Sequence, residues 1–267
     1  MKKIIFILSF SLFLNSLCAQ SLIFDFKESK TCLTKNVENT KALDINLVDF
    51  INKLNSDLIF IPFNLPLIDE IFLDVSLKNF SVINDNHTLI IETDNGQQIE
   101  EFNSDLLSYY IFHEDEIIGT LLYFDNNIIV TYKYGNRQFE INTINNEIIL
   151  FDVNDCTNKN TFSCAVEEKT REISVNHSSS ENITIPDCIE LAIEIDQYTR
   201  NTFSSNAAAS TWAHAIIAGV SQVYFGEVNI HINVVHTIIW NTADPYALII
   251  SDAGAMLSAL RNHWITD

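Results

Sequence analysis

The sequence predicts an α+β fold, with a β-rich antiparallel meander in the N-terminal part and an α/β arrangement at the C-terminal end. Two observations lead to this prediction. Between residues 71 and 151, short alternating apolar segments are separated by breaks rich in Asn, Asp and Gly, which is typical of antiparallel hairpins. After residue 187, the apolar period changes from that of a strand to that of a helix and back again.

The first 19 residues have the pattern of an export signal. Lys2 and Lys3 precede an apolar run over residues 4–14, and Ala19 supplies the small residue of a cleavage site. Lipid attachment at Cys18 is the alternative, which the bulky leucine before it disfavours. We therefore expect a secreted or extracytoplasmic protein with no membrane contact after signal removal, because no later stretch approaches the about 18 apolar residues that span a bilayer.

The overall charge argues against one large class of partners. The chain has 15 basic and 35 acidic residues, a formal net charge of −20, and 47% hydrophobic residues. A phosphate backbone is bound by clustered Lys and Arg side chains, and this sequence has no such cluster. The composition therefore predicts an acidic globular protein that does not bind nucleic acid.

Residues 20–166 are predicted to form one β-rich domain. It begins with an amphipathic helix whose apolar face is formed by Leu43, Leu47, Phe50, Ile51 and Leu54. Strands are expected at residues 71–77, 117–124, 128–132, 138–143 and 147–151. The last of these follow one another as a meander, because the breaks between them contain residues that tolerate positive φ. Such a sheet also fits a binding or adhesion module.

Residues 167–186 are polar, include a run of serines and predict a flexible linker. Lys169 and Arg171 within this linker are candidates for an activation cleavage. The chain is thus divided into a signal peptide at residues 1–19, the β-rich domain, the linker and a second domain at residues 187–267.

The second domain is predicted to open with a strand, a helix and a second strand. The first strand carries alternating branched side chains at Ile189, Leu191, Ile193 and Ile195. The helix covers residues 207–225, ends at Gly226 and packs on the sheet through Trp212, Ile216, Val220 and Val223. Residues 230–240 alternate again, and the helical connection makes this strand parallel to the first. A further helix is expected at residues 253–264.

Several segments of this domain carry a family resemblance through their order and spacing. They are Ile189-Glu190-Leu191 followed by Asp196, Val223-Tyr224, residues 228–235, Ile238-Ile239-Trp240 and Leu260-Arg261-Asn262-His263-Trp264. Together they resemble the opening of a reprolysin-like catalytic domain, which belongs to the metzincin zinc endopeptidases. The resemblance implies that residues 187–267 begin a metzincin-like domain with a twisted mixed sheet and that residues 20–166 are a prodomain. It also implies a zinc metalloendopeptidase precursor that acts on protein or peptide substrates.

The zinc motif of that family is not found in this sequence. The family binds zinc through H-E-x-x-H-x-x-G-x-x-H, in which the glutamate is the general base. His113-Glu114 comes nearest, but Ile117 stands where the second histidine would be. We therefore assign no catalytic and no metal-binding residue, and we expect an inactive chain that covers the part of a precursor before the active site. The alternative is a non-catalytic secreted binding or protease-inhibitory protein.

The cysteines allow two interpretations. Cys32, Cys156, Cys164 and Cys188 follow the export signal and permit three complete pairings. A disulfide between Cys156 and Cys164 closes the shortest loop and is the first choice. In the second interpretation, Cys164 is a cysteine switch whose thiolate binds the zinc of the complete enzyme and keeps the precursor inactive.

Two further metal candidates lie in the second domain. The resemblance suggests Glu190 as one ligand of a structural calcium ion, because some reprolysin-like enzymes use the acidic residue of this strand in that way. The alternative is an exposed acidic residue at the edge of the sheet, since calcium needs six to eight oxygen ligands. His231 and His236 are five residues apart, so on a regular strand they point to opposite faces and need a bulge to bind one ion. We expect His236 to be half-buried on the apolar face of Ile232 and Val234.

Overall fold

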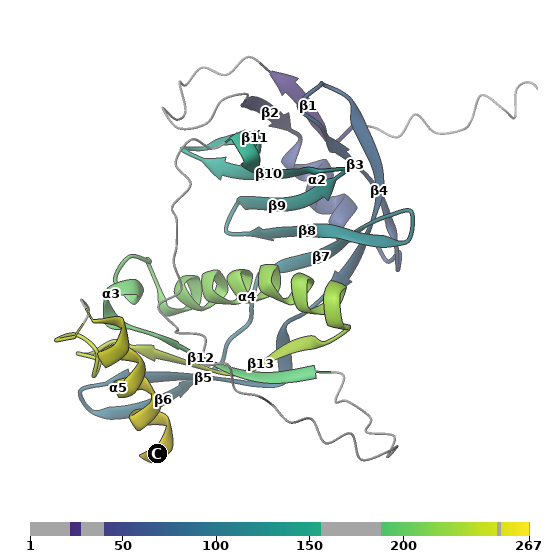
Figure 1. Cartoon of the computed structure of the whole chain (residues 1–267). Coiled ribbons are helices and arrows are strands. Elements are labelled where there is room, and N and C mark those ends of the chain that lie inside the picture. The colour runs from purple at the N-terminus through teal and green to yellow at the C-terminus, as the bar shows by residue number, and fades with distance from the viewer. Residues whose placement is uncertain (1–21, 28–39, 156–187, 250–251, 267) are drawn as a thin grey trace, which may run out of the picture.

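The computed structural model describes residues 22–27, 40–155, 188–249 and 252–266. The expected export signal, the linker and the cysteines at positions 32, 156 and 164 lie outside the described residues. The α+β prediction is confirmed. A nine-stranded antiparallel sheet curves into a half-barrel, and a four-stranded mixed sheet packs with helices beside it (Figure 1).

The nine-stranded sheet is built by the N-terminal part of the chain. Its order is β1 (Phe24–Lys27), β2 (Lys41–Ile45), β11 (Glu147–Asp152), β10 (Arg137–Ile144), β9 (Asn127–Tyr134), β8 (Glu116–Phe124), β7 (Leu107–His113), β4 (Phe72–Phe80) and β3 (Ile61–Pro66). The meander prediction is confirmed for β8 to β11, which pair antiparallel in sequence order. Their tight turns use positive φ at Asp125, Asn126, Gly135, Asn145 and Asn146.

The inner side of the half-barrel is filled by α2 (Leu47–Leu54) and by aromatic rings (Figure 1). Phe50 of α2 lies 6.2 Å from the ring centroids of both Phe24 and Phe63. The Tyr109 hydroxyl donates a 2.8 Å hydrogen bond to the carbonyl of Leu54 at the end of the helix. The two ends of the sheet, β1 and β3, contact each other, so the half-barrel encloses its own hydrophobic core.

Helix α2 begins later than the apolar spacing predicts. Leu43 belongs to β2, and the helix starts at Leu47 because Asn46 caps it by accepting a 3.3 Å hydrogen bond from the amide of Asp49. Leu43 and Phe50 both point into the same core, where neither is exposed. The shared core explains why the helical spacing continues across the boundary between strand and helix.

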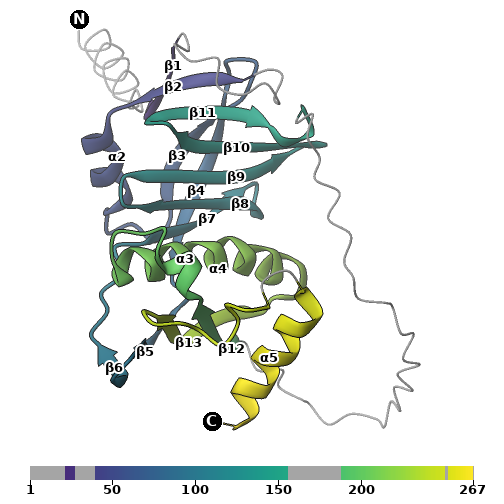
Figure 2. The same cartoon turned by 90° about the vertical axis from the view of Figure 1, so that its left-hand side faces the viewer.

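The four-stranded sheet joins both halves of the sequence. Its order is β12 (Cys188–Ile195), β13 (His231–Trp240), β5 (Ile83–Thr93) and β6 (Gly96–Glu100). The predicted parallel pairing of β12 with β13 is confirmed, and β13 is also parallel to β5. The β5–β6 hairpin comes from the N-terminal part and adds two strands beside β13 (Figures 1 and 2). The sequence pattern does not predict this shared sheet.

Helix α4 (Asn206–Val228) lies between the two sheets (Figures 1 and 2). Its buried sides carry mostly small residues, namely Ala209, Ser210, Thr211, Ala213, His214, Ala215, Ala218 and Ser221. The prediction that the helix packs on the sheet through its larger apolar stripe holds for Trp212, which packs on the core of the second sheet. It is wrong for the rest of the stripe, because Ile216, Val220 and Val223 are 47%, 40% and 47% exposed. A helix between two sheets buries two sides, and the branched stripe lies on a side that neither sheet covers.

The predicted end of this helix at Gly226 is also wrong. Helix α4 continues to Val228, and Asn229 ends it in the left-handed conformation with φ 55°, donating its amide to the Phe225 carbonyl at 3.0 Å. The remaining helices are η1 (Val153–Asp155), α3 (Gln197–Arg200) and α5 (Ala253–Thr266), the last close to its predicted range. No helix within the described ranges is long and apolar enough to cross a membrane.

Candidate functional site

A groove follows the open edge of β12. Among the described strands, β12 is an end strand of its sheet, so the backbone groups of its outer edge pair with no other strand. We call this cavity of about 590 Å³ the β12 groove, and it is lined by Ile193, Glu194, Ile195, Asp196, Thr199, Trp212, Ala213, Ile216, Ile217, Tyr246, Met256, Leu257 and Leu260.

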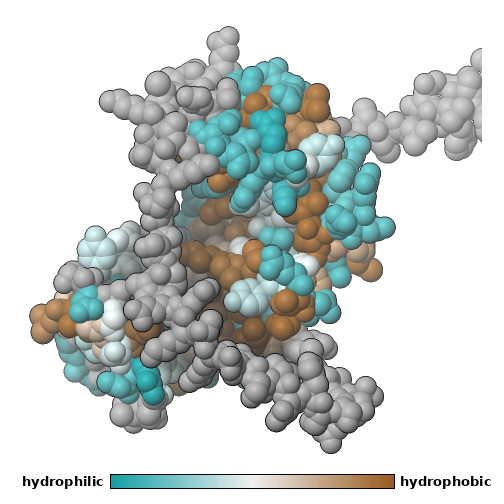
Figure 3. Space-filling view, viewed as in Figure 1, coloured by the Kyte–Doolittle hydropathy of each residue, from teal (hydrophilic) through white to brown (hydrophobic). Residues whose placement is uncertain are grey.

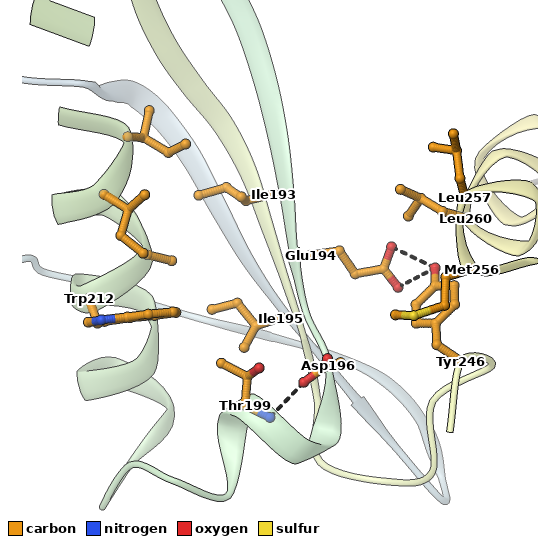
Figure 4. Close-up of a pocket in the computed structure, with 13 residues that line it drawn as sticks. Ile193, Glu194, Ile195, Asp196, Thr199, Trp212, Tyr246, Met256, Leu257 and Leu260 are labelled. Carbon is orange, nitrogen blue, oxygen red and sulfur yellow. Dashed lines mark hydrogen bonds between the residues drawn. The ribbon is translucent and has the colours of Figure 1, made fainter. Parts of the chain in front are cut away.

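The alternation of β12 divides the groove into two sides (Figure 4). Ile193 and Ile195 point toward Trp212 and α4, whereas Glu194 points the opposite way, toward Tyr246 and α5. Apolar side chains of α5 complete the second side. The groove therefore places apolar surface on both faces of the sheet, directly beside the unpaired strand edge.

The branched stripe of α4 borders the first side of the groove. Trp212 and Ile216 line the groove directly, and Val220 and Val223 follow on the same helical face. On the face seen in Figure 3, hydrophobic residues gather at the level of α4, between the two sheets. A row of exposed branched side chains beside an unpaired strand edge is an apolar surface that a further element of structure can cover.

Glu194 ties the elements around the second side together. Its carboxylate accepts hydrogen bonds from the Trp240 indole at 2.5 Å, the Tyr246 hydroxyl at 2.9 and 3.0 Å, and the Trp264 indole at 3.0 Å. These donors come from the end of β13, the segment after it and α5. Burial, together with the hydrogen bond to Glu194, raises the pKa of Tyr246. The hydroxyl therefore stays protonated and remains a donor.

Two aspartates hold the end of the groove where β12 turns into α3. Asp196 caps α3 by accepting a 2.6 Å hydrogen bond from the Thr199 amide. Asp244, which is buried, accepts hydrogen bonds from the amides of Gln197 at 2.9 Å and Tyr246 at 2.8 Å. Both carboxylates bind backbone amides, so their role in the described structure is to fix the shape of the groove.

The described residues do not provide a zinc site. Within these ranges no group of three or more His, Cys, Asp or Glu side chains could hold a metal ion. What the β12 groove offers chemically is strand addition, in which an extended segment pairs with the free edge of β12 while its side chains enter the apolar walls.

The residues singled out in the sequence lie apart from one another. His113 and Glu114 are at the β7–β8 hairpin rather than on a helix, and the His113 ring contacts the Asp74 carbonyl at 3.0 Å. Glu190 is exposed on β12. Cys188 is half-buried and is a free thiol among the described residues, whereas Cys156 and Cys164 lie outside them.

The two histidines of β13 are separated despite a bulge. The pairing of β13 with β12 and with β5 shifts its register at Val235. Beyond this bulge the alternation of inward and outward side chains on β13 is displaced by one residue, so Thr237 rather than His236 follows Val234 on the buried face. His236 is therefore exposed, and the prediction that it is half-buried on the apolar face is wrong. His231 stacks on Phe225 at 4.2 Å, at the other end of the strand.

A histidine cluster, in which His214 is buried and His87 is half-buried, lies on the inner face of the same sheet. The Nε2 atoms of His87 on β5 and His214 on α4 both lie 2.9 Å from the hydroxyl oxygen of Thr237 on β13. The two imidazole rings are 5.0 Å apart and nearly perpendicular. No local pattern in the sequence indicates this cluster, because its members are distant in the sequence and only the pairing of β5 with β13 brings them together.

Comparison with known proteins adds no assignment. No protein-family model matches the sequence, and no curated protein shows a significant match.

Proposed function

We propose that this chain is the N-terminal portion of a secreted zinc-dependent metalloendopeptidase precursor of the metzincin type. Residues 20–166 would form its prodomain, residues 167–186 its linker and residues 187–267 the first part of its catalytic domain. The segments that resemble the family supply β12, α4, β13 and α5, and the parallel pairing of β12 with β13 supports the proposal.

The observation that carries the proposal is the surface around β12 that the described residues leave uncovered. The strand has a free edge, and the α4 stripe beside it leaves Ile216, Val220 and Val223 about half exposed. Covering a half-exposed Ile or Val side chain contributes about 1 kcal/mol to stability. A further strand and its connections from the same catalytic domain would satisfy both the backbone edge and this stripe.

Zinc in the complete enzyme would polarise the scissile carbonyl and activate water. Its ligands would come from outside the described residues, which do not form a ligand set. The described residues contribute support instead, since β12, α4 and β13 form the scaffold and Glu194 fixes α5 against it. A structural calcium ion at Glu190 remains part of the proposal.

Cys164 provides a separate test of the latent state. If its thiolate binds zinc in the precursor, Cys164→Ser should give premature activity, because serine is a much weaker zinc ligand at neutral pH. If Cys164 instead forms a disulfide with Cys156, latency should persist after this substitution, and peptide mapping should recover the linked pair.

The proposal as a whole is tested by expressing the chain together with the coding sequence downstream of codon 267. We expect an H-E-x-x-H motif in that segment and zinc-dependent peptide hydrolysis, which replacement of the motif glutamate by glutamine should abolish. A stop codon directly after codon 267 in the source gene, or an extension without a zinc motif, would overturn it.

A second candidate function is a binding or inhibitory protein. The observation that favours it is the β5–β6 hairpin, which adds to the edge of β13 as an inhibitor strand would add to a related sheet in trans. This function predicts that the purified 267-residue chain is a stable monomer that binds a related peptidase. Absence of binding to metzincin peptidases, together with aggregation of the chain, would exclude it.

A further inference from the structure

The histidine cluster joins three elements from both halves of the sequence. His87 belongs to the β5–β6 hairpin, His214 to α4 and Thr237 to β13. His214 and Thr237 have no exposed surface. The Phe102 ring, which follows β6, lies 5.3 Å from the His214 ring and 5.7 Å from the His87 ring. His214 is therefore covered on one side by two rings that both come from the hairpin region.

The hydrogen bonds of this cluster suit neutral imidazoles. The Thr237 hydroxyl has one proton, so it can donate to only one Nε2 atom, and at least one of the two imidazoles donates its Nε2–H to the hydroxyl oxygen. The Nδ1 atom of His214 is buried and has no hydrogen-bond partner among the described residues. A proton added at Nδ1 would therefore place a charged N–H group in the interior without an acceptor.

The charged groups around the cluster do not compensate for such a proton. Burial, with a smaller effect of His236 on β13, lowers the pKa of His87. Burial, with a smaller effect of His87, lowers the pKa of His214 to about 3. On the hairpin side, Glu100 and Glu101 line an outer pocket with His87. Among the described residues, both imidazoles form their side-chain hydrogen bond with Thr237.

We propose that His87, His214 and Thr237 form an acid-sensitive latch that holds the β5–β6 hairpin on the α/β part at neutral pH and releases it as the pH falls. Removing the hairpin takes away His87 and Phe102 together, so His214 becomes accessible to water and can accept a proton. Release would leave the half-barrel intact, because its core contains no residue of the hairpin. It would take Leu89 and Ile91 out of the core of the second sheet, so the opening is confined to that sheet. The latch does not depend on the proposed peptidase function.

The direction of the pH effect follows from the direction in which the histidine pKa is shifted. A histidine whose pKa is lower in the closed state than the usual value near 6.5 stabilises the closed state above pH 6.5. This stabilisation weakens as the pH falls below 6.5, and it is lost progressively toward pH 3 for His214. In this range the ratio of closed to open hairpin should fall about tenfold per pH unit for each histidine that takes up a proton.

The latch is tested by measuring amide hydrogen exchange of the purified chain between about pH 7.5 and about pH 5. The rates are corrected for the intrinsic exchange rate at each pH. We expect the protection of residues 83–100 to fall about tenfold per pH unit below about 6.5, while that of β9 and β10 stays constant. The double variant His87→Gln/His214→Gln should show no pH dependence in the hairpin. His113→Gln, which changes a histidine outside the cluster, should behave as the unmodified chain.

Two results would overturn the proposal. One is hairpin protection that does not change with pH in the unmodified chain, and the other is a pH dependence that persists in the double variant. If the double variant does not fold, the imidazole resonances of the unmodified chain decide. The latch requires the pKa of His214 to lie far below the usual histidine pKa while the hairpin is closed. Titration of His214 near pH 6.5 with a protected hairpin would contradict it.

Discussion

At the scale of single residues, two glutamates on one strand differ in their exposure to solvent and in their hydrogen bonds. Glu190 and Glu194 have the same alternation on β12, yet Glu190 is exposed, whereas Glu194 accepts hydrogen bonds from two indoles and a hydroxyl. The difference comes from the elements that pack against each side chain. Glu194 bonds to Tyr246 in the segment after β13 and to Trp264 of helix α5, and so helps to attach both to the sheet.

Glu194→Gln should lower the free energy of unfolding by about 2 kcal/mol, because bonds to a charged acceptor are lost and the new amide donor faces N–H and O–H groups. Glu190→Gln is the matched control on the same strand and should change stability by less than about 0.5 kcal/mol. Urea denaturation followed by tryptophan fluorescence measures both. Equal effects of the two substitutions would show that the Glu194 contacts do not stabilise the fold.

At the scale of elements, α4 determines how the two sheets meet. Small side chains on its buried sides allow both sheets to approach the helix, and Ala218 contacts a cluster that includes Val82, Leu122 and Phe124 of the N-terminal part. The larger side chains Ile216 and Val220 remain on the uncovered side. The helix thus contacts the two sheets through its small residues, and its exposed branched residues could pack against a further strand or helix.

Ala218→Leu should destabilise the 267-residue chain by about 3 kcal/mol, because there is no space for the added atoms between the sheets. Ile216→Lys should change the stability of the same chain by less than about 1 kcal/mol, since that side chain is already half exposed. Thermal unfolding compares the two variants. In a longer protein whose next strand covers the β12 groove, Ile216→Lys should become strongly destabilising, and a small effect there would contradict the proposed completion of the sheet.

At the scale of the whole molecule, the two halves of the sequence are held by more than the chain connection between them. The β5–β6 hairpin is part of the second sheet, and α4 contacts strands of both sheets. A ladder of stacked rings also crosses the contact, with centroid distances of 3.8 Å for Phe80–Tyr110, 5.0 Å for Tyr110–Phe225 and 4.2 Å for Phe225–His231. Separation of the halves would break all of these contacts together.

We therefore expect that a single cut after Lys169 or Arg171 leaves both fragments associated at neutral pH. Mild trypsin treatment followed by size-exclusion chromatography should give one peak that contains both fragments, and the same sample in denaturant should give two. Separate elution of the native fragments would show that the shared sheet and the ring ladder are too weak to hold the halves together.

The sequence by itself determined the elements that depend on local patterns. Alternation and turn residues such as Asn145 and Asn146 were sufficient to predict the meander, because a tight hairpin is set by its own few residues. The parallel pairing of β12 with β13 also followed from the helix between them. These predictions needed no knowledge of distant segments.

Only the tertiary structure decided which surfaces meet. Periodicity shows that Trp212, Ile216 and Val220 share a helical face, but it does not show whether a sheet covers that face. The partner of β5, and with it the meeting of His87 and His214, depends on a contact between segments far apart in the chain. The physical reason is that an apolar face or a free strand edge can be satisfied by any complementary surface, and the packing of the whole chain selects which one.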